Sequence, residues 1–332
     1  STVTGDLSKQ RLGRTEAGLR ALSGAEHCFH IAALYDIEAE PETLAATNIG
    51  GTRHLLKALQ EAGFGGRLHH VSSVAVAGDY TDTFTESMLD EGQRFPHAYH
   101  RSKYESEKLI RESQFDYRIY RPSSVVGDST TGAIDKVDGV YFSFGAIQRL
   151  AHAMPAWLQL PAPRIRGAFN VVPVDYVADA MVHIALSDTE TRVFHLVDPK
   201  PPSLTKMSNI FLAAAGGPRS GPSIDLAKLP GARKTAGRVS MRPRVRELSD
   251  AVLDDLGFPR GALAAMNVKA RFDDSNTLKA LAESGIRCPP LRSYAKALYR
   301  YFEDHLDPTK NRSARYREAL SSKVVLITGS SR

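Results

Sequence analysis

RLHHVSS, residues 67–73, decides the fold, because it is a short apolar run that ends in two serines. A run of this length between helical patterns is typical of a buried strand in a parallel sheet. Two similar runs flank it in the sequence, HCFHIA at 27–32 and DYRIYRPSSVV at 116–126. Helical spacing separates the three runs, over Leu44–Glu61 and Tyr99–Glu112. This alternation predicts an α/β fold with a doubly wound parallel sheet joined by crossover helices.

A serine, a tyrosine and a lysine follow this strand at a spacing that suits hydride transfer. Ser73 ends the strand, and Tyr99 and Lys103 stand four residues apart in AYHRSKYE. Residues four apart share one face of a helix, so the Lys103 ammonium can stabilise a Tyr99 phenolate and lower a pKa that is about 10 in free tyrosine. Such a phenol can protonate the oxygen of a carbonyl that receives a hydride, while Ser73 holds that oxygen by a hydrogen bond.

The trio therefore predicts a reductase site, in which Ser72 is the less favoured serine and Lys103 also reaches the ribose of a nicotinamide cofactor. The competing interpretation is that the YxxxK pair arises by chance on a helix and that Ser73 merely ends a strand.

Length and composition indicate a chain with a full core and without a membrane span. The 332 residues suffice for one large and one smaller domain, and no run of about 18 apolar residues occurs. The first residues lack a signal-peptide pattern, so a cytoplasmic location is expected. Cys28 and Cys288 stand outside any CxxC pattern, which argues against a zinc ribbon or a disulfide scaffold. The net charge of +6 suits a phosphate-bearing small molecule or serves solubility alone, and no nucleic-acid partner is predicted.

Two groups of residues resemble binding motifs but are interpreted otherwise. Gly63, Gly65 and Gly66 follow a predicted helix and precede a strand, which is the reverse of a phosphate-binding loop, so they are predicted to cap the helix and form a turn. Four histidines lie near predicted strand and helix ends without the spacing of metal ligands, namely His69, His70, His97 and His100. No metal site is predicted.

Several short motifs resemble those of extended short-chain dehydrogenases/reductases. They are GDL at 5–7, HIAA at 30–33, TNIGGT at 47–52, VSS at 71–73, the YxxxK pair and RPSSVVG at 121–127. Longer segments are similar to the N-terminal domain of bacterial two-domain fatty acyl-CoA reductases, namely HIAALYD, DKVDGVYFSFGAIQRLAHAMPAW, FNVVPVDYVADAM, FHLVDP and RFDDSNTLKALAESGI. This second resemblance extends along nearly the whole chain. It implies a Rossmann-like sheet, incomplete at its N-terminus, beside a smaller, mainly helical substrate-binding region.

The resemblance implies four parts along the chain. Residues 1–199 are expected to form an NAD(P)-binding Rossmann-like domain without its first βαβ unit, and residues 200–306 the substrate-binding region. Residues 307–322 are polar and charged, as a linker should be. Residues 323–332, KVVLITGSSR, then resemble the first strand and truncated glycine loop of a second short-chain reductase domain in the same full-length chain.

Matching positions in the family imply cofactor-binding and catalytic residues. The implied cofactor-binding residues are Asp6 with Leu7 at the adenine, Ala32 and Ala33 beside the pyrophosphate and ribose, Tyr99, Lys103, and Pro122 with Val125 near the carboxamide. Asn48 joins Ser73, Tyr99 and Lys103 as a catalytic residue, because it matches an asparagine that organises a water relay to the lysine. The alternative for Asn48 is a helix side chain bonded to the backbone.

The resemblance also implies an activity. We expect NADPH-dependent reduction of a long-chain acyl-CoA or a fatty aldehyde toward the fatty alcohol, with Tyr99 as proton donor. NAD is not excluded, because the segment that distinguishes the two cofactors precedes this chain. Without the glycine-rich phosphate loop, the chain alone is expected to bind cofactor poorly and to be inactive. In two-domain relatives the second domain resembles enzymes that reduce acyl-CoA to aldehyde, which assigns the aldehyde-to-alcohol step to this domain.

Two other functions remain open. Another extended short-chain reductase, such as a nucleotide-sugar epimerase or a 3-beta-hydroxysteroid-type dehydrogenase, would share the general motifs. A non-catalytic cofactor-sensing or scaffold module is the alternative from another class. Acyl chain length and oligomeric state are not predicted.

Three segments also have two interpretations each. The aromatic residues Tyr141, Phe142, Phe144 and Trp157 line an acyl tunnel or pack as core. The basic stretch Arg233–Arg246 holds coenzyme A phosphates or contacts a membrane surface, or it is simply solvated. Val324–Thr328 pairs with the open edge of His27–Ile31, or it belongs to a loosely placed tail.

Overall fold

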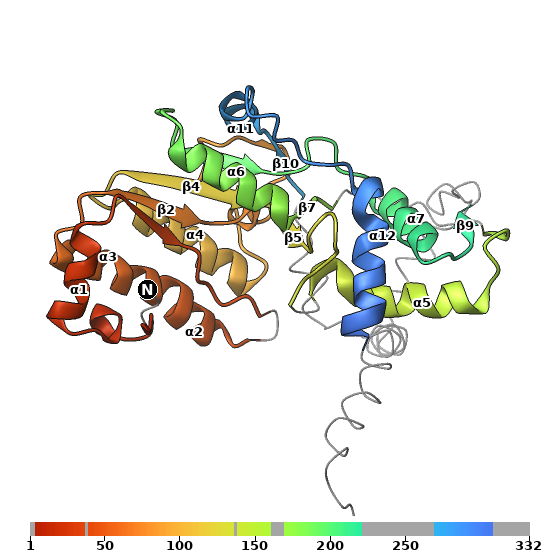
Figure 1. The fold of residues 1–332 in the computed structure, drawn as a ribbon, viewed down its shortest axis with the longest axis horizontal. Helices are drawn as coiled ribbons and strands as arrows, with labels where there is room; N and C mark the ends of the chain where they lie inside the picture. Colours follow the sequence, from red (N-terminus) through yellow and green to blue (C-terminus); the bar gives the residue numbers. More distant parts are fainter. Residues whose placement is uncertain (1–3, 37–38, 136–137, 161–168, 221–268, 308–332) are drawn as a thin grey trace, which may run out of the picture.

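A computed structural model describes five stretches of the chain, residues 4–36, 39–135, 138–160, 169–220 and 269–307. Two lobes are visible in Figure 1. The first, here called the sheet lobe, contains a parallel sheet with helices on both faces. The second, called the helical lobe, contains α5, α7 and α12. The predicted α/β, Rossmann-like fold class is thereby confirmed.

The sheet has four parallel strands in the order β1-β2-β4-β8. They are β1 (His27–His30), β2 (Arg67–Val71), β4 (Tyr117–Pro122) and β8 (Val193–Leu196). The register pairs His30 with His70 across the first two strands. The three strands from β2 onward are largely buried, as expected of parallel strands covered on both faces. Their carboxyl ends lie at one edge of the sheet, where ligands bind in folds of this kind.

Helices cover the two faces of the sheet unequally (Figure 1). One face carries α1 (Glu16–Ser23), α2 (Pro41–Leu44), α3 (Gly51–Ala62) and α4 (Ala98–Arg111), and the other carries α6 (Val174–Leu186). Leu55 and Leu59 of α3 pack with Leu68 and Ile119 of the sheet. On the other face, α6 packs against Tyr120 and Phe194. Burial of these apolar side chains is the main force that holds the layers together.

Gly63 ends α3 with a φ of 69°, in the left-handed region that glycine adopts without strain. Its amide bonds to the Gln60 and Leu59 carbonyls. The predicted helix cap is confirmed.

The helical lobe is built around aromatic side chains. It comprises η4 (Gly139–Ser143), α5 (Phe144–Ala153), α7 (Leu204–Ala214), α12 (Leu291–Tyr301) and η6 (Phe302–Leu306). The Phe144 ring lies 4.8 Å from Phe211 and 5.3 Å from Phe302, measured between centroids. Tyr141 belongs to the same buried cluster, whereas Trp157 is 79% exposed. Core packing therefore accounts for Tyr141 and Phe144, and no tunnel is needed to explain them.

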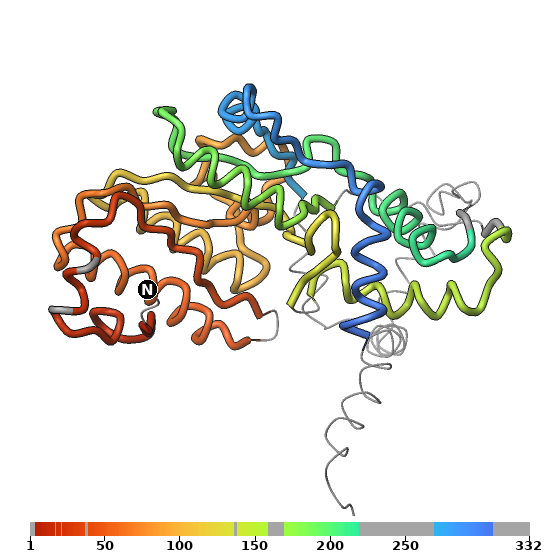
Figure 2. The backbone as a smooth tube through the Cα atoms, viewed as in Figure 1, coloured from red at the N-terminus to blue at the C-terminus, as the bar shows by residue number. Residues whose placement is uncertain are grey.

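The two lobes are interleaved along the chain. After α7, the described chain resumes at residue 269 and returns to the sheet lobe before it enters α12 (Figure 2). There β10 (Arg271–Phe272) pairs with β3 (Thr83–Phe84), and α11 (Ser275–Ala280) contacts β8. Between the lobes, β5 (Ser124–Val126) pairs with β7 (Val171–Pro173). The domain boundary predicted at residue 199 remains a prediction. Each lobe contains residues that precede position 199 and residues that follow it.

The remaining elements are short. They are η1 (Gln10–Gly13), η2 (Ala45–Gly50), η3 (Val74–Ala77), β6 (Gln159–Leu160) and β9 (Arg219–Ser220). Residues 308–322 of the predicted linker, the segment 323–332 with Val324–Thr328, and the basic stretch Arg233–Arg246 lie outside the described residues.

β1 is the end strand of the described sheet. Phe29 is 42% exposed and Ile31, which follows the strand, is 60% exposed. His30 turns the other way and reaches Thr52 of α3 with a ring nitrogen 3.0 Å from the hydroxyl. The face of β1 opposite α3 is thus open within the described part of the chain.

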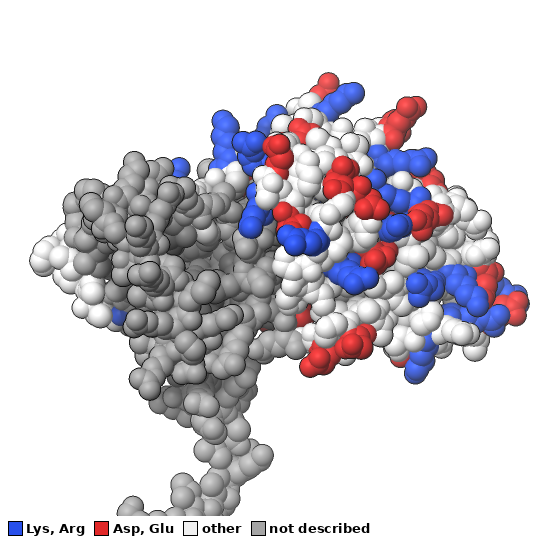
Figure 3. All heavy atoms as spheres, turned by 180° about the vertical axis from the view of Figure 1, so that it is seen from behind, with Lys and Arg blue, Asp and Glu red and all other residues white. Residues whose placement is uncertain are grey.

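One face of the described residues, seen in Figure 3, is of mixed charge. Figure 3 shows lysine and arginine side chains interspersed with aspartate and glutamate on the visible face. None of the helices in the described stretches is long and apolar enough to cross a membrane.

Candidate active site

Ser73, Tyr99 and Lys103 meet at the carboxyl end of β2. Ser73 caps η3, and its hydroxyl accepts a hydrogen bond from the Ala75 amide at 3.1 Å. Tyr99 lies in the first turn of α4, where His97 caps the helix by accepting from the Tyr99 amide. The Tyr99 and Ser73 side chains are hydrogen-bonded to each other. The structure thus joins Ser73 to the tyrosine, whereas Ser72 bonds elsewhere.

The Tyr99 phenol is held in its protonated form. Burial and the neighbouring Tyr35 phenol raise its pKa well above the ordinary 10.0, the hydrogen bond with Ser73 lowers it, and the Asp138 carboxylate adds a further rise. This direction is opposite to the expected lowering by Lys103. The physical reason is that burial of the phenol is the largest effect on its pKa. The Lys103 ammonium donates to the Val71 carbonyl at 2.8 Å and is not among the groups that shift the Tyr99 pKa.

Lys103 is almost completely buried one turn after Tyr99. Burial lowers its pKa from 10.5 to about 8, and the Glu107 carboxylate opposes part of that shift. His30 and His70 are buried near the same ammonium, and burial together with the Lys103 charge lowers both of their pKa values. The lysine thus holds its charge in surroundings that favour the neutral amine.

Replacing Lys103 by methionine is expected to stabilise the fold by about 2 kcal/mol at pH 7, because a buried charge is removed. Between pH 8 and pH 10.5 the unfolded chain holds a proton that the folded lysine has lost, so wild-type stability rises with pH in that window. The advantage of the methionine variant should therefore shrink over the same window. Urea denaturation from pH 7 to pH 10.5 measures this, and a constant difference would contradict it.

Asn48 fixes the backbone that follows β1. It lies in the π-helical turn η2, a rare local geometry that often marks functional positions. Its amide group accepts from the Leu34 amide at 2.7 Å and donates to the Leu34 carbonyl at 3.0 Å and to the Ser102 hydroxyl at 2.9 Å. Ser102 in turn donates to the Tyr99 carbonyl. These contacts are with the backbone and a serine, and the predicted water relay to Lys103 remains a prediction.

Tyr35, next to the residue that Asn48 holds, packs against the Tyr99 ring. The two ring centroids are 4.8 Å apart and the planes meet at 79°, an edge-to-face contact. Burial and the Asp138 charge raise the pKa of Tyr35 to about 12. Tyr35 and Asp138 thus both act on the Tyr99 phenol, and the sequence alone indicates no role for either.

The residues expected to bind the cofactor occupy different places. Ala32 and Ala33 are exposed just after β1, while Pro122 ends β4 and is buried. Val125 lies in β5, between the lobes. These four residues lie at or beyond the carboxyl ends of strands.

Asp6 and Leu7 lie near the beginning of α3. The Asp6 carboxylate accepts from the Ser8 amide and hydroxyl at 2.9 and 2.7 Å. The Leu7 carbonyl is 2.8 Å from a ring nitrogen of His54 in α3. Their predicted contact with the adenine remains a prediction.

The carboxyl edge of the sheet fits the nicotinamide end of a dinucleotide. Ala32 and Ala33 present only methyl groups, so a ligand can approach their backbone closely, and the Lys103 ammonium and Tyr99 phenol lie beside the next strand. Within the described stretches, no strand leads through a glycine-rich loop into a helix in the way that holds a pyrophosphate. In the same stretches, no three histidine, cysteine, aspartate or glutamate side chains are grouped to hold a metal ion.

Sequence reasoning missed Glu107, which is fully buried under the trio. It stands four residues after Lys103, the same spacing that links Lys103 to Tyr99. Applying that spacing once more along the helix could have found it.

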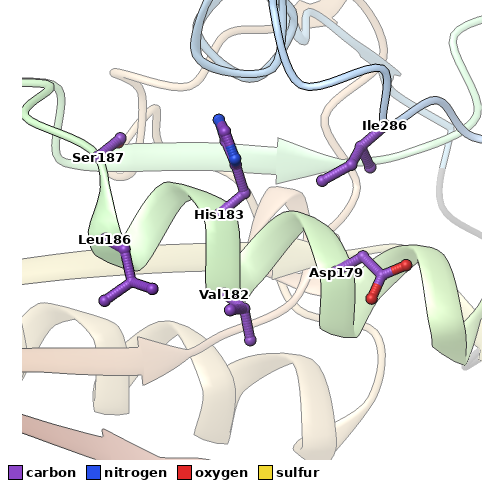
Figure 4. Close-up of a pocket in the computed structure, with 6 residues that line it drawn as sticks. All are labelled: Asp179, Val182, His183, Leu186, Ser187 and Ile286. Carbon is purple, nitrogen blue, oxygen red and sulfur yellow. The ribbon is translucent and has the colours of Figure 1, made fainter.

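A shallow hollow lies away from the trio, on the outer side of α6. It is lined by Asp179, Val182, His183, Leu186, Ser187 and Ile286. In Figure 4, Val182 and Leu186 point to one side of the helix and His183 to the other. None of the predicted site residues lines it.

The parallel sheet, with the Ser73–Tyr99 pair and the adjoining Lys103 at its edge, is the fold of an NAD(P)-binding domain of the extended short-chain dehydrogenase/reductase type. A family profile described as male sterility protein matches residues 1–181, which is more than half of the chain. The chain belongs to this NAD-binding family.

Known proteins with similar sequence or structure include multidomain synthetases and reductases. The terminal R domain of the myxalamid PKS-NRPS pathway has 26% sequence identity and a TM-score of 0.66, with 91% of this chain and 75% of that chain covered. The non-canonical nonribosomal peptide synthetase hkm10 of Aspergillus hancockii is 27% identical over 92% of this chain. The aldehyde reductase lnbA of Aspergillus flavus is 28% identical over 59% of it. The chain spans only 30% of hkm10 and 20% of lnbA.

Proposed function

We propose that this protein reduces a fatty aldehyde, or the acyl group of a fatty acyl-CoA, toward the fatty alcohol with NADPH. The observation that carries the proposal is the hydrogen bond between Ser73 and a protonated Tyr99, with Lys103 one turn behind. Two neighbouring hydroxyl groups can donate hydrogen bonds to the same carbonyl oxygen and stabilise the oxyanion that develops there. The name of the relative lnbA, an aldehyde reductase, agrees with this class of substrate.

In the proposed reaction the bound dinucleotide supplies the hydride to the carbonyl carbon. Ser73 and Tyr99 hold the carbonyl oxygen by hydrogen bonds, and Tyr99 gives up its phenolic proton as negative charge develops there. The raised pKa of Tyr99 keeps the proton on the phenol until that moment. Lys103, with a pKa of about 8, is mostly charged at neutral pH. In the proposed reaction its ammonium turns from the Val71 carbonyl, which it contacts in this structure, toward the phenolate and stabilises it there.

The test uses the complete polypeptide that contains this chain, supplied with NADPH or NADH. We expect NADPH oxidation with a long-chain aldehyde and formation of the alcohol, measured by absorbance and by product analysis. A Ser73→Ala variant should retain cofactor binding and lose most of the turnover, which separates the site from a contaminating reductase. Turnover with the acyl-CoA alone would overturn the assignment of the aldehyde step, and turnover of a nucleotide sugar or a sterol alone would overturn the proposal.

A second candidate is reduction of an acyl group held as a thioester on a synthetase. It is favoured by the similarity to hkm10 over 92% of the chain and to the myxalamid terminal R domain. The same hydroxyl pair would hold the thioester carbonyl oxygen. A hydride from the bound dinucleotide would add to the carbonyl carbon, the carbon–sulfur bond would break, the carrier would leave as its free thiol, and the product would be the aldehyde. An acyl thioester on a carrier protein, offered beside the free aldehyde and the acyl-CoA, distinguishes the two candidates.

A further inference from the structure

The Glu107 carboxylate is the centre of a fully buried polar network. Its side chain and that of Arg121 are both 0% exposed. One carboxylate oxygen accepts from the Ser72 hydroxyl at 2.6 Å and from an Arg121 nitrogen at 3.0 Å. The other accepts from Arg121 at 2.7 Å and from Arg111 at 2.9 Å. A carboxylate with this many donors is fully satisfied and keeps one position.

Each of these contacts leads to a different part of the site. Ser72 adjoins Ser73 at the end of β2, and Arg121 adjoins Pro122 at the end of β4. Glu107 itself lies one helical turn after Lys103 on α4. Three elements that carry predicted site residues are therefore joined through one side chain.

Glu107 also carries the negative charge that acts on the Lys103 ammonium from one helical turn away. Burial would raise the pKa of Glu107, but the charges of Arg121 and Arg111 and the hydrogen bonds outweigh burial, so it is ionised. The other groups that face Lys103 are His30 on β1, His70 on β2 and the Val71 carbonyl. Both histidines are neutral in these surroundings, so Glu107 is the charged group here that favours the ammonium.

We propose that Glu107 is a positioning residue, which holds the ends of β2 and β4 in register with α4 and keeps Lys103 protonated during turnover. The inference rests on the proposed function only for its kinetic readout. The positive charges of Arg111 and Arg121 partly offset the attraction between the Glu107 carboxylate and the Lys103 ammonium. Arg111, whose side chain is 21% exposed, is the member that can be changed at least risk to the core.

The test compares three variants of the complete polypeptide, Glu107→Gln, Arg111→Gln and Ser72→Ala. The first removes the negative charge, so the Lys103 pKa should fall and the alkaline limit of kcat should move to lower pH by about half a unit or more. Arg111→Gln removes a positive charge that offsets the Glu107 carboxylate. The Lys103 pKa should therefore rise, and the alkaline limit of kcat should move to higher pH. Ser72→Ala removes one hydrogen bond and no charge, and its limit should stay in place.

Stability measurements give a readout that needs no turnover. The stability difference between the wild type and the Lys103→Met variant begins to narrow near the Lys103 pKa of about 8, as derived above. When Glu107→Gln is introduced into both the wild type and the Lys103→Met variant, their stability difference should begin to narrow at lower pH. When Arg111→Gln is introduced into both instead, the narrowing should begin at higher pH. If Glu107→Gln does not fold, the upward shift in Arg111→Gln still tests the proposal. Unmoved onsets in the folded variants overturn it, whereas absent turnover in the wild type counts against the proposed function alone.

Discussion

Replacing Tyr99 by phenylalanine is expected to lower kcat by about 10²- to 10⁴-fold, the usual contribution of one general acid. The substitution removes only the phenolic oxygen, so the ring keeps its edge-to-face contact with Tyr35. The proton donor and the hydrogen bond with Ser73 are lost together. Steady-state kinetics of the complete polypeptide with aldehyde and NADPH measure the effect, while cofactor affinity should change little.

Tyr104 provides the matched control on the same helix. It packs with Phe95 in a separate cluster, with 4.8 Å between the ring centroids. Tyr104→Phe should leave kcat within a few-fold of the wild type, because its oxygen takes no part in the site. Near-normal turnover in Tyr99→Phe, or an equal loss in both variants, would remove Tyr99 from the role of proton donor.

Replacing Gly132 by alanine is expected to destabilise the fold by about 2–4 kcal/mol. Its φ of 77° lies in the left-handed region, and a Cβ atom there would meet the Ala297 carbonyl of α12 well inside the 3.0 Å that real Cβ atoms keep. Because the opposing atoms are backbone, α12 has to shift against the aromatic core of the helical lobe. Urea or thermal denaturation of the folded protein measures the loss.

Gly63 is the control for this second prediction. Its φ of 69° is similar, yet no atom lies within 4 Å of a Cβ built there. Gly63→Ala therefore carries the conformational cost alone, about 1 kcal/mol. Equal losses in the two variants would show that the close approach to α12 contributes nothing.

The sequence was sufficient to predict the parallel sheet and that Ser73, Tyr99 and Lys103 lie close together, while their roles in catalysis remain a prediction. Short apolar runs that end in polar residues have few other interpretations, and the i, i+4 pair of Tyr99 and Lys103 is a local property of one helix. The resemblance to extended short-chain reductases was confirmed by the family profile over residues 1–181. The substrate remains a proposal, because the general motifs are shared by many activities.

Contacts between distant segments could not be predicted in the same way. Asp138 and Tyr35 are about a hundred residues apart in sequence, and only the folded chain shows that both act on Tyr99. The predicted direction of the shift in the Tyr99 pKa was wrong for the same reason. Spacing along a helix reveals neither the burial of the phenol nor the hydrogen bond from Lys103 to a strand carbonyl. The Glu107 network likewise needs β2, β4 and α4 to be in place together.

The open side of β1 bears on how this stretch of chain behaves when it is produced by itself. Within the described stretches no strand pairs with the outer edge of β1, and an unpaired edge with apolar neighbours such as Phe29 and Ile31 is a template to which other extended segments add. Expression, concentration and crystallisation of residues 4–307 will thus depend on what covers that edge. Natural edge strands often carry charged side chains, which discourage such addition. Charged residues in place of Phe29 and Ile31 would have the same effect on β1.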